Sequence, residues 1–385
     1  MKSPSKIVSS FKESIFSTMT AKANALGAIN LAQGFPDFDG PKWIQDFAIK
    51  AIAEGFNQYA PSPGASKLRQ SIKKTLQNYY QLDYSEQTEI TVTNGATEAL
   101  FCSALSLLNP GDEVILFEPY YDSYMACIKM AGAKPVPVTL YGPDFSLDEE
   151  KIEKAFTSKT KAIFLNSPHN PTGKVFTKKE LEFLSTLILK HDVYVISDEV
   201  YEFLTFDDHV HIPMATLPSM KERTFTISSS GKTFGLTGWK IGWCAAPEHL
   251  TKGIRMVHQY NSFGVAHPLQ MAIAHALDNI ERHLKEFKPL YLKKRNLFFE
   301  GLKKANLNPI LPKGTYFILC KIPENLNKTD IDFCYDLMEN KKVAAIPTSA
   351  FYSLHPEEGQ KYIRLCFAKK DNTLSKAISF LTMEK

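Results

Sequence analysis

Residues 224–245 of this chain read TFTISSSGKTFGLTGWKIGWCA. The apolar run from Thr224 to Ser228 is typical of a buried strand, and Ile241 to Ala245 predicts a second one. Between them lies a loop rich in Ser and Gly that carries Lys232. Open α/β sheets bind ligands just beyond the carboxyl ends of their strands, so this loop is the first place to look for a functional lysine.

A nucleotide P-loop is one alternative for this stretch, because Gly231-Lys232-Thr233 matches the end of that motif. The motif needs a further glycine five places before Gly231, where this chain has Thr226, so the P-loop is rejected. A second lysine, Lys240, follows eight residues after Lys232. Two amines and several hydroxyls suit a phosphate by their charge and their hydrogen-bond donors.

The alternation of short apolar runs with longer helical patterns continues through the middle of the chain. It predicts an α/β fold in which helices cover a mostly parallel sheet. The other strand candidates are Glu89 to Thr93, Glu113 to Phe117, Lys161 to Leu165 and Val193 to Ser197. Helical patterns span Ser66 to Tyr80, Thr97 to Leu107, Lys178 to Lys190 and Pro268 to Phe287. We expect the last helix to bridge two domains.

Two domains are also expected from the length of 385 residues, which exceeds the size at which one core usually keeps growing. Beyond about residue 290 the pattern mixes helices with strand-like runs at Tyr316 to Lys321 and Tyr362 to Ala368. We therefore predict an N-terminal arm and small-domain segment at 1–40, a large ligand-binding domain at 41–287, and a small α+β domain at 288–385.

The composition excludes several classes of protein. Lys plus Arg total 45 and Asp plus Glu total 41, a net charge of +4 that is too small and dispersed for a nucleic-acid footprint. The N-terminal stretch MKSPSKIVSSFKESIF is broken by Lys and Ser, so we expect neither a signal peptide nor a membrane span, and place the protein in the cytoplasm.

The cysteines lie mostly inside apolar runs and form no CxxC pair. They are Cys102, Cys127, Cys244, Cys320, Cys334 and Cys366. This pattern predicts buried free thiols, which fit a reducing compartment, and no disulfide framework. No metal site is predicted.

Polar residues also follow three other predicted strands. Asn94-Gly95-Ala96-Thr97-Glu98 opens a helix whose free N–H groups suit a phosphate, with a plain helix cap as the alternative. Residues 166–173, NSPHNPTG, present Asn170 from a loop fixed by two prolines, unless they form only a tight turn. Asp198 and then Tyr201 follow the third strand, where a carboxylate needs either a helix N-terminus or a protonated ring nitrogen as its partner.

Arg364 lies within the apolar run Tyr362-Ile363-Arg364-Leu365-Cys366-Phe367, which predicts a strand. An unpaired arginine is costly in such a place, so we expect it to have an anionic partner. A structural salt bridge and a bound carboxylate both meet that need.

Taken in their order along the chain, these segments resemble the class I aminotransferases of the fold-type I pyridoxal-phosphate enzymes. The resemblance is closest to the branch of methionine aminotransferases and kynurenine aminotransferase/glutamine transaminase K. It is carried by LAQGFPDF at 31–38, NQYAPSPG at 57–64, TNGATEAL at 93–100, NSPHNPTG at 166–173, SDEVYE at 197–202, SSSGKTFGLTGWKIGW at 228–243, KGTYF at 313–317 and IRLCFAK at 363–369.

The resemblance implies a role for each candidate near the cofactor, pyridoxal 5′-phosphate. Lys232 would hold it as a Schiff base and, once released by substrate, carry the proton between Cα and C4′. Asp198 would pair with the ring nitrogen and keep it protonated, which makes the ring an electron sink. Tyr201 and Asn170 would hydrogen-bond the phenolic oxygen. Tyr121 would stack on the ring, with a core aromatic as the alternative.

The phosphate and the subunit arrangement follow from the same resemblance. The groups that would hold the phosphate are Ser229, Lys240, the backbone of Ala96 and Thr97, and the Tyr59 hydroxyl of a neighbouring subunit. A homodimer is therefore implied. The position of Lys240 is often arginine elsewhere in the superfamily, and lysine should still serve as a point charge.

Substrate contacts are implied as well. The groups that would hold the α-carboxylate are Arg364, Asn170 and the Gly34 backbone. Phe16 and Phe263 match positions that line the side-chain pocket in the kynurenine branch, with packing as the alternative. Gly264 departs from that branch, where a histidine can follow the phenylalanine, and this weakens any case for kynurenine. The expected donor is methionine or an aromatic amino acid, with glutamine as a further candidate.

Two other functions remain open. The same scaffold supports cysteine-conjugate β-lyase chemistry, in which a good leaving group on Cβ is expelled. A cofactor-binding sensor attached to a DNA-binding domain belongs to a different class of protein. We do not expect it, because the motifs start by residue 31 and leave no room for a winged-helix module.

Overall fold

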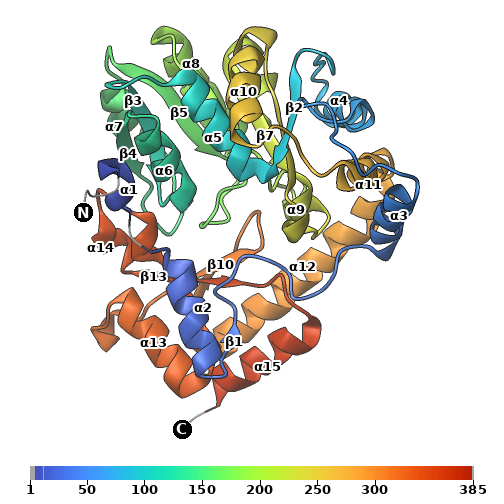
Figure 1. Cartoon of the computed structure of the whole chain (residues 1–385). Helices are drawn as coiled ribbons and strands as arrows, with labels where there is room; N and C mark the ends of the chain where they lie inside the picture. The colour runs from blue at the N-terminus through green and yellow to red at the C-terminus, as the bar shows by residue number, and fades with distance from the viewer. Residues whose placement is uncertain (1–4, 12, 384–385) are drawn as a thin grey trace, which may run out of the picture.

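Seven strands form one sheet in the order β2-β8-β7-β6-β5-β3-β4 (Figure 1). Their bounds are β2 (Ile90–Asn94), β3 (Glu113–Glu118), β4 (Lys134–Thr139), β5 (Thr160–Asn166), β6 (Tyr194–Asp198), β7 (Thr224–Ser229) and β8 (Ile241–Ala245). Only β8 runs against its neighbours within this sheet. The predicted mostly parallel α/β sheet is therefore confirmed in this computed structural model, which describes residues 5–11 and 13–383.

Helices cover the large sheet, and further helices lie in the C-terminal part of the chain. They are α1 (Lys6–Ser9), α2 (Ile15–Ala25), α3 (Lys42–Ala53), α4 (Ser66–Tyr80), α5 (Gly95–Leu107), α6 (Asp122–Met130), α7 (Glu149–Ala155), α8 (Lys178–Lys190), α9 (Ser230–Thr233), α10 (Glu248–Asn261), α11 (His267–Asp278), α12 (Ile280–Lys304), α13 (Asp330–Lys341), α14 (Pro356–Gly359) and α15 (Asp371–Thr382). Local signals set several boundaries. Thr177 and Glu180, for example, form a reciprocal capping box at the start of α8.

A smaller antiparallel sheet follows α12, in the order β12-β13-β10-β9. Its strands are β9 (Asn308–Ile310), β10 (Phe317–Lys321), β12 (Ile346–Pro347) and β13 (Tyr362–Cys366). β1 (Ile29–Asn30) pairs in parallel with β11 (Val343–Ala344), so the N-terminal segment joins the C-terminal part of the chain. Figure 1 shows α2 beside α13 in that part.

The prediction of one helix from Pro268 to Phe287 is wrong. The helix breaks at Asn279, whose side-chain amide donates to the carbonyl of His275 (2.9 Å). Such a bond competes with the helical ladder, and α12 then starts afresh at Ile280. Because α12 is continuous to Lys304, a domain boundary at 287/288 would fall inside a helix, and the division of the chain stays a prediction.

The edge strand β4 was not predicted, because KPVPVT contains two prolines. It pairs only with β3, and an edge strand tolerates prolines that lack an N–H. The six predicted strands of the large sheet are found within one or two residues of their expected bounds.

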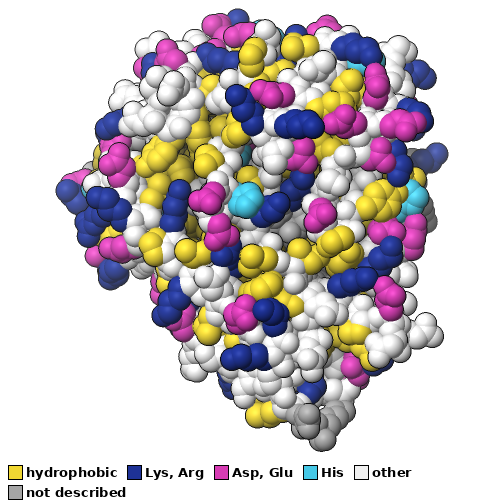
Figure 2. All heavy atoms as spheres, turned by 180° about the vertical axis from the view of Figure 1, so that it is seen from behind, with side chains coloured by type: hydrophobic (Ala, Val, Ile, Leu, Met, Phe, Trp, Pro, Cys, Tyr) yellow, Lys and Arg dark blue, Asp and Glu magenta, His cyan; other side chains and the backbone are white. Residues whose placement is uncertain are grey.

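The surface carries mixed charge. Figure 2 shows Lys and Arg side chains interspersed with Asp and Glu over the visible face rather than gathered in one basic area. Among the described helices, none is both long enough and apolar enough to cross a bilayer. All six cysteines are buried and free, as predicted.

Candidate active site

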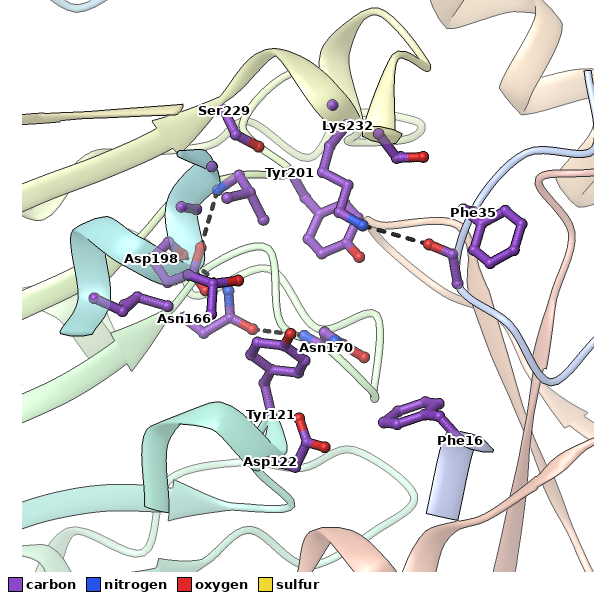
Figure 3. Close-up of a pocket in the computed structure, with 18 of the residues that line it drawn as sticks. Phe16, Phe35, Tyr121, Asp122, Asn166, Asn170, Asp198, Tyr201, Ser229 and Lys232 are labelled. Carbon is purple, nitrogen blue, oxygen red and sulfur yellow. Dashed lines mark hydrogen bonds between the residues drawn. The ribbon is translucent and has the colours of Figure 1, made fainter. Parts of the chain in front are cut away.

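The carboxyl ends of three parallel strands meet at the floor of a cavity of about 430 Å³. β5 ends at Asn166, β6 at Asp198 and β7 at Ser229, and Asn166 and Asp198 are neighbours in the sheet register. α9 follows β7 directly and carries Lys232 into the same cavity (Figure 3). Three segments that are far apart in the sequence therefore place their polar side chains together.

Asp198 is buried at this floor, with 4% of its surface exposed. Its Oδ2 accepts a hydrogen bond from the Tyr124 hydroxyl (2.6 Å), and its Oδ1 accepts one from the Val200 N–H (3.3 Å). Burial raises the pKa of Asp198 to about 6, against the opposing effect of the Tyr124 bond. A nearby cation would restore the charged form, so the carboxylate is suited to a protonated ring nitrogen.

Lys232 projects into the cavity from α9 (Figure 3). Its Nζ donates to the Tyr316 hydroxyl (3.0 Å) and to the Gly34 carbonyl (3.3 Å). Burial lowers the pKa of this amine to about 8, although Cys366 and Asp198 act in the opposite direction. A lysine with a lowered pKa has a larger neutral fraction near pH 7, and the neutral amine is the nucleophile.

Two tyrosines flank these groups. Tyr201 is buried in the cavity wall, and its ring packs edge-on against Tyr316 with centroids 5.2 Å apart. Tyr121 also lines the cavity and packs edge-on against Tyr124 at 5.6 Å. Burial raises the pKa of Tyr121 to about 12, so its hydroxyl is neutral at pH 7.

The amino terminus of α5 closes one end of the cavity. Ala96 and Thr97 lie in the first turn of α5 and line the cavity together with Ser229 and Lys240. Gly242 permits this arrangement, because a Cβ there would lie 2.5 Å from the Ala96 nitrogen. Backbone N–H groups, a hydroxyl and an amine thus face the same space, which suits a phosphate.

Arg364 lies on β13 at the opposite wall and is 1% exposed. Its guanidinium donates to Asn170 Oδ1 (2.8 Å) and to the Ala32 carbonyl (3.2 Å), while Nε is buried without a hydrogen-bond partner among the described residues. Asn170 is itself held through its N–H by Asn166 Oδ1 (2.8 Å), as Figure 3 shows. The guanidinium keeps a donor free, which suits a bound carboxylate.

The remaining predicted residues divide into two groups. Phe16 and Gly34 line the cavity, and the Phe16 ring centroid lies 5.2 Å from the Arg364 guanidinium. Tyr59 and Phe263 lie outside the cavity wall of their own chain and pack edge-on against each other at 5.5 Å. They are 86% and 46% exposed.

Among the functional candidates that sequence reasoning missed are Tyr124, Asn166 and Asp122, which line the cavity, and Tyr316, whose hydroxyl accepts from Lys232. Tyr316 stands in the quoted motif KGTYF, and Asn166 opens NSPHNPTG, so both lay within recognised segments. Asp122 lines the cavity near Ser14 Oγ, 3.5 Å from its Oδ2. Tyr124 carries no local signal, because its contact with Asp198 depends on how α6 packs against β6.

A family model described as aminotransferase class I and II matches residues 27–381. The chain belongs to this family. The kynurenine–oxoglutarate transaminase of Dictyostelium discoideum is 41% identical, over 97% of this chain and 94% of its own length. The probable N-succinyldiaminopimelate aminotransferase of Mycobacterium tuberculosis is 42% identical, over 97% and 96%. The solved structure of the methionine aminotransferase of Escherichia coli superposes with a TM-score of 0.95, 38% identity and coverage of 99% and 100%.

The match to the aminotransferase family confirms both the resemblance seen in the sequence and the predicted fold type. Pyridoxal phosphate is therefore the cofactor of this chain. The residues present fit that group. The cavity contains the Lys232 amine, whose pKa is lowered, and the buried Asp198 carboxylate, whose pKa is raised. It also contains the start of α5, which can approach β8 closely because Gly242 has no side chain. Within the described residues, no cluster of His, Cys, Asp and Glu is arranged to hold a metal ion.

Proposed function

We propose that this aminotransferase moves the α-amino group of a neutral amino acid to a 2-oxo acid by a ping-pong mechanism. The donor is methionine or an aromatic amino acid, with glutamine as a further candidate. Pyridoxal phosphate, when bound, withdraws electrons from the substrate Cα. All other steps belong to side chains of the protein.

In this proposal Lys232 Nζ attaches the cofactor covalently and, once displaced by substrate, moves the proton from Cα. The support is its position in the cavity and its lowered pKa of about 8. Asp198 would pair with the protonated ring nitrogen, and Tyr124 holds that carboxylate in place (2.6 Å). Tyr201 and Asn170 would bind the phenolic oxygen, and Tyr121 would cover the ring. Ser229, Lys240 and the first turn of α5 would hold the phosphate.

The proposed substrate class rests on the number of positively charged side chains in the cavity wall. In the described part of the chain they are Lys232, Lys240 and Arg364. When Lys232 and Lys240 serve the cofactor, Arg364 is left for one carboxylate, which is the α-carboxylate common to all amino acids. A second carboxylate on the substrate side chain would find no cation in this chain, and it would face Asp122. Acidic donors should therefore be poor.

This argument supports one of the activities named for the relatives over another. An N-succinyl group ends in a second carboxylate, whereas methionine and kynurenine lack one. The aromatic groups Phe16 and Phe317 in the cavity wall are also better matched to an apolar side chain. We therefore favour the methionine and aromatic class over N-succinyldiaminopimelate.

We also propose a homodimer in the cytoplasm. Tyr59 and Phe263 form an exposed aromatic pair outside their own cavity, as expected if both complete the site of a partner subunit. The six buried free thiols are compatible with a reducing compartment.

A half-reaction screen tests the proposal. Purified holoenzyme is mixed with each common amino acid and with N-succinyldiaminopimelate, and the absorption of the bound cofactor is followed as it converts to the pyridoxamine form. We expect methionine, phenylalanine and tyrosine to convert it fastest and aspartate slowest. A faster reaction with aspartate, glutamate or N-succinyldiaminopimelate would contradict the substrate class but leave the aminotransferase activity intact.

A further inference from the structure

We propose that Glu98 is a positioning residue that holds the start of α5 against the loop carrying Phe263, and so sets the geometry of two active sites at once. The first is the phosphate end of its own subunit, and the second is the side-chain pocket of the partner. The second half of the inference rests on the proposed homodimer.

Glu98 lies outside the cavity wall and is 7% exposed, yet its carboxylate is surrounded by donors. Oε2 accepts from the Asn94 N–H (2.5 Å) and from Asn94 Nδ2 (3.1 Å). Oε1 accepts from Ser262 Oγ (2.6 Å) and Asn261 Nδ2 (3.0 Å), and it lies 3.1 Å from His258 Nδ1. One oxygen therefore faces the end of β2, and the other faces the end of α10.

The contacts of Oε2 fix the phosphate end. Asn94 is the last residue of β2 and immediately precedes Gly95, where α5 begins. From the other side, a Cβ on Gly242 would lie 2.4 Å from the Gly95 carbonyl carbon, so the helix start is held between β8 and the Glu98 carboxylate. The N–H groups of Ala96 and Thr97 follow directly, and their direction depends on this turn.

The contacts of Oε1 fix the aromatic pair. Ser262 precedes Phe263, which has a positive φ of 66°, a conformation that an aromatic residue keeps only when its surroundings impose it. His258 reaches further, since its Nε2 lies 2.9 Å from the Ser62 carbonyl in the segment that carries Tyr59. Figure 1 shows α5 and α10 side by side. Glu98 on α5 and His258 on α10 are both buried, and their side chains meet between the two helices.

The charge on Glu98 strengthens both sets of contacts. Burial opposes the charged form, but the bonds from His258, Ser262 and Asn94 together lower the pKa of Glu98 to about 2. The carboxylate is therefore ionised throughout the neutral range. A glutamine in its place would turn one acceptor into a donor that faces other donors.

The first experiment compares Glu98→Gln with Ser262→Ala and with Glu113→Gln as a matched control. Glu113 is also a buried carboxylate, which accepts from Thr157 (2.7 Å) and Lys134 (3.0 Å) at the far end of the sheet. The readouts are the dissociation constant of pyridoxal phosphate, measured by dialysis of the holoenzyme, and the ratio of kcat/KM for methionine to that for alanine.

We expect Glu98→Gln to weaken cofactor binding about tenfold or more and to lower the methionine-to-alanine ratio by a similar factor. Ser262→Ala, which removes only the contact next to Phe263, should lower the ratio severalfold and leave cofactor binding within twofold. Glu113→Gln should lower Tm without changing either quantity. If Glu98→Gln also lowers only Tm, Glu98 is merely structural and the inference is wrong.

Hybrid dimers separate the two sites. In a hybrid of a Glu98→Gln subunit with a Lys232→Ala subunit, the one competent site has a defective α5 start and receives an intact Phe263. Its cofactor binding should stay weak, while its substrate ratio returns to the wild-type value. A hybrid of wild type with a Glu98→Gln/Lys232→Ala subunit should show the reverse. If both defects follow the same subunit, the coupling between sites is excluded.

A last hybrid tests the proposed homodimer separately from the proposed role of Glu98. It combines wild type with a Phe263→Ala/Lys232→Ala subunit. An unchanged methionine-to-alanine ratio there would overturn the shared site and hence the proposed dimer arrangement. The effect of Glu98→Gln on cofactor binding in the homogeneous variant would still decide the role of Glu98 at the phosphate end.

Discussion

The floor of the cavity and its rim are built in different ways. We call the strand-end residues Asn166, Asp198 and Ser229, with Lys232 on α9, the floor. We call three aromatic residues the rim. Phe16 lines the cavity of its own chain, and Tyr59 and Phe263 form the exposed pair that we propose completes the cavity of a partner subunit. Each floor residue lies at or directly after the end of a buried strand of the large sheet. The rim residues lie on α2 and on two surface segments, and two of them, Tyr59 and Phe263, are exposed and do not line the cavity of their own chain.

The contrast separates chemistry from selectivity. Sheet register places Asn166 beside Asp198 on rigid strands, which suits groups that must meet reacting atoms. The rim depends on packing between segments and, in our proposal, between subunits. Changes at the floor should therefore affect every substrate, whereas changes at the rim should affect substrates according to their side chains.

Among substitutions at the floor, Lys232→Ala should have the largest effect on turnover. We expect turnover to fall on the order of 10⁴-fold or more, because the nucleophile and the proton carrier are lost together. The protein should stay folded and still bind cofactor without a covalent bond. Borohydride reduction of the wild type followed by peptide mass mapping checks the assignment, and a reduced pyridoxyl group on another lysine would show that Lys232 is not the attachment site.

Asp198→Asn removes the carboxylate charge that we propose pairs with the ring nitrogen, and it keeps almost the same side-chain shape. We expect the half-reaction to slow by about 10²- to 10⁴-fold, with a modest loss of cofactor. Stopped-flow absorption measures it. The matched control is Tyr124→Phe, which removes only the 2.6 Å bond to Asp198 and should have a much smaller effect. Slowing of less than about tenfold, roughly 1.4 kcal/mol, for Asp198→Asn would leave it as a structural cap.

Arg364→Ala tests the proposed binding of the substrate α-carboxylate. Arg364 lines the cavity but belongs to neither the floor nor the rim. Removing a buried charge-assisted partner costs about 3 to 5 kcal/mol, so kcat/KM should fall by roughly 150- to 5,000-fold for every donor. The order of methionine, phenylalanine and alanine should survive, because the α-carboxylate is common to all three. Steady-state kinetics on the three donors are the measurement, and a loss confined to one donor would show that Arg364 contacts a side chain.

At the rim, Phe263→Ala should lower kcat/KM for methionine and phenylalanine by about ten- to several-hundred-fold and barely change it for alanine. A pocket wall contributes about 1 to 3 kcal/mol for each apolar contact that is lost. Phe16→Ala is the companion variant on the cavity side of its own chain. Equal losses for alanine and methionine would mean that these rings support the fold rather than the pocket.

The smallest expected effect concerns pH. In our proposal the neutral amine of Lys232 attacks the cofactor aldehyde, and burial lowers the pKa of this amine to about 8 from the usual 10.5. The rate of covalent capture by cofactor-free protein should therefore rise about tenfold per unit up to pH 8 and then level off. Rapid-mixing absorption between pH 6 and 10 measures it. Asp198→Asn should move this midpoint lower, because the Asp198 charge favours the protonated amine.

The floor was predictable from the sequence because its signals are local. An apolar run followed by Asp198 or Ser229 marks a strand end, and parallel strands bring their ends together. Asn166 ends a strand in the same way, but the sequence directed attention to Asn170 four residues later. Lys240 and Ala96 were predictable for the same reason, since β8 begins and β2 ends at that edge of the sheet.

The rest depended on packing between distant segments. Nothing near Tyr124 indicates that α6 places its hydroxyl against Asp198. The break at Asn279 was hidden because apolar periodicity continues on both sides of it. The exposed pairing of Tyr59 with Phe263 joins residues about two hundred positions apart, and no local pattern in the sequence indicates such a contact.

The burial of every cysteine has a practical consequence for labelling. All six thiols are covered, and burial raises the pKa of Cys102 to about 12 and that of Cys127 to about 11, so neither thiol forms the reactive thiolate near neutral pH. A cysteine introduced on the surface, for instance Val210→Cys at a side chain that is 71% exposed and does not line the cavity, would then be the dominant site for a maleimide dye. Fluorescence energy transfer between labelled subunits could be recorded on the otherwise native sequence, without first removing any natural cysteine.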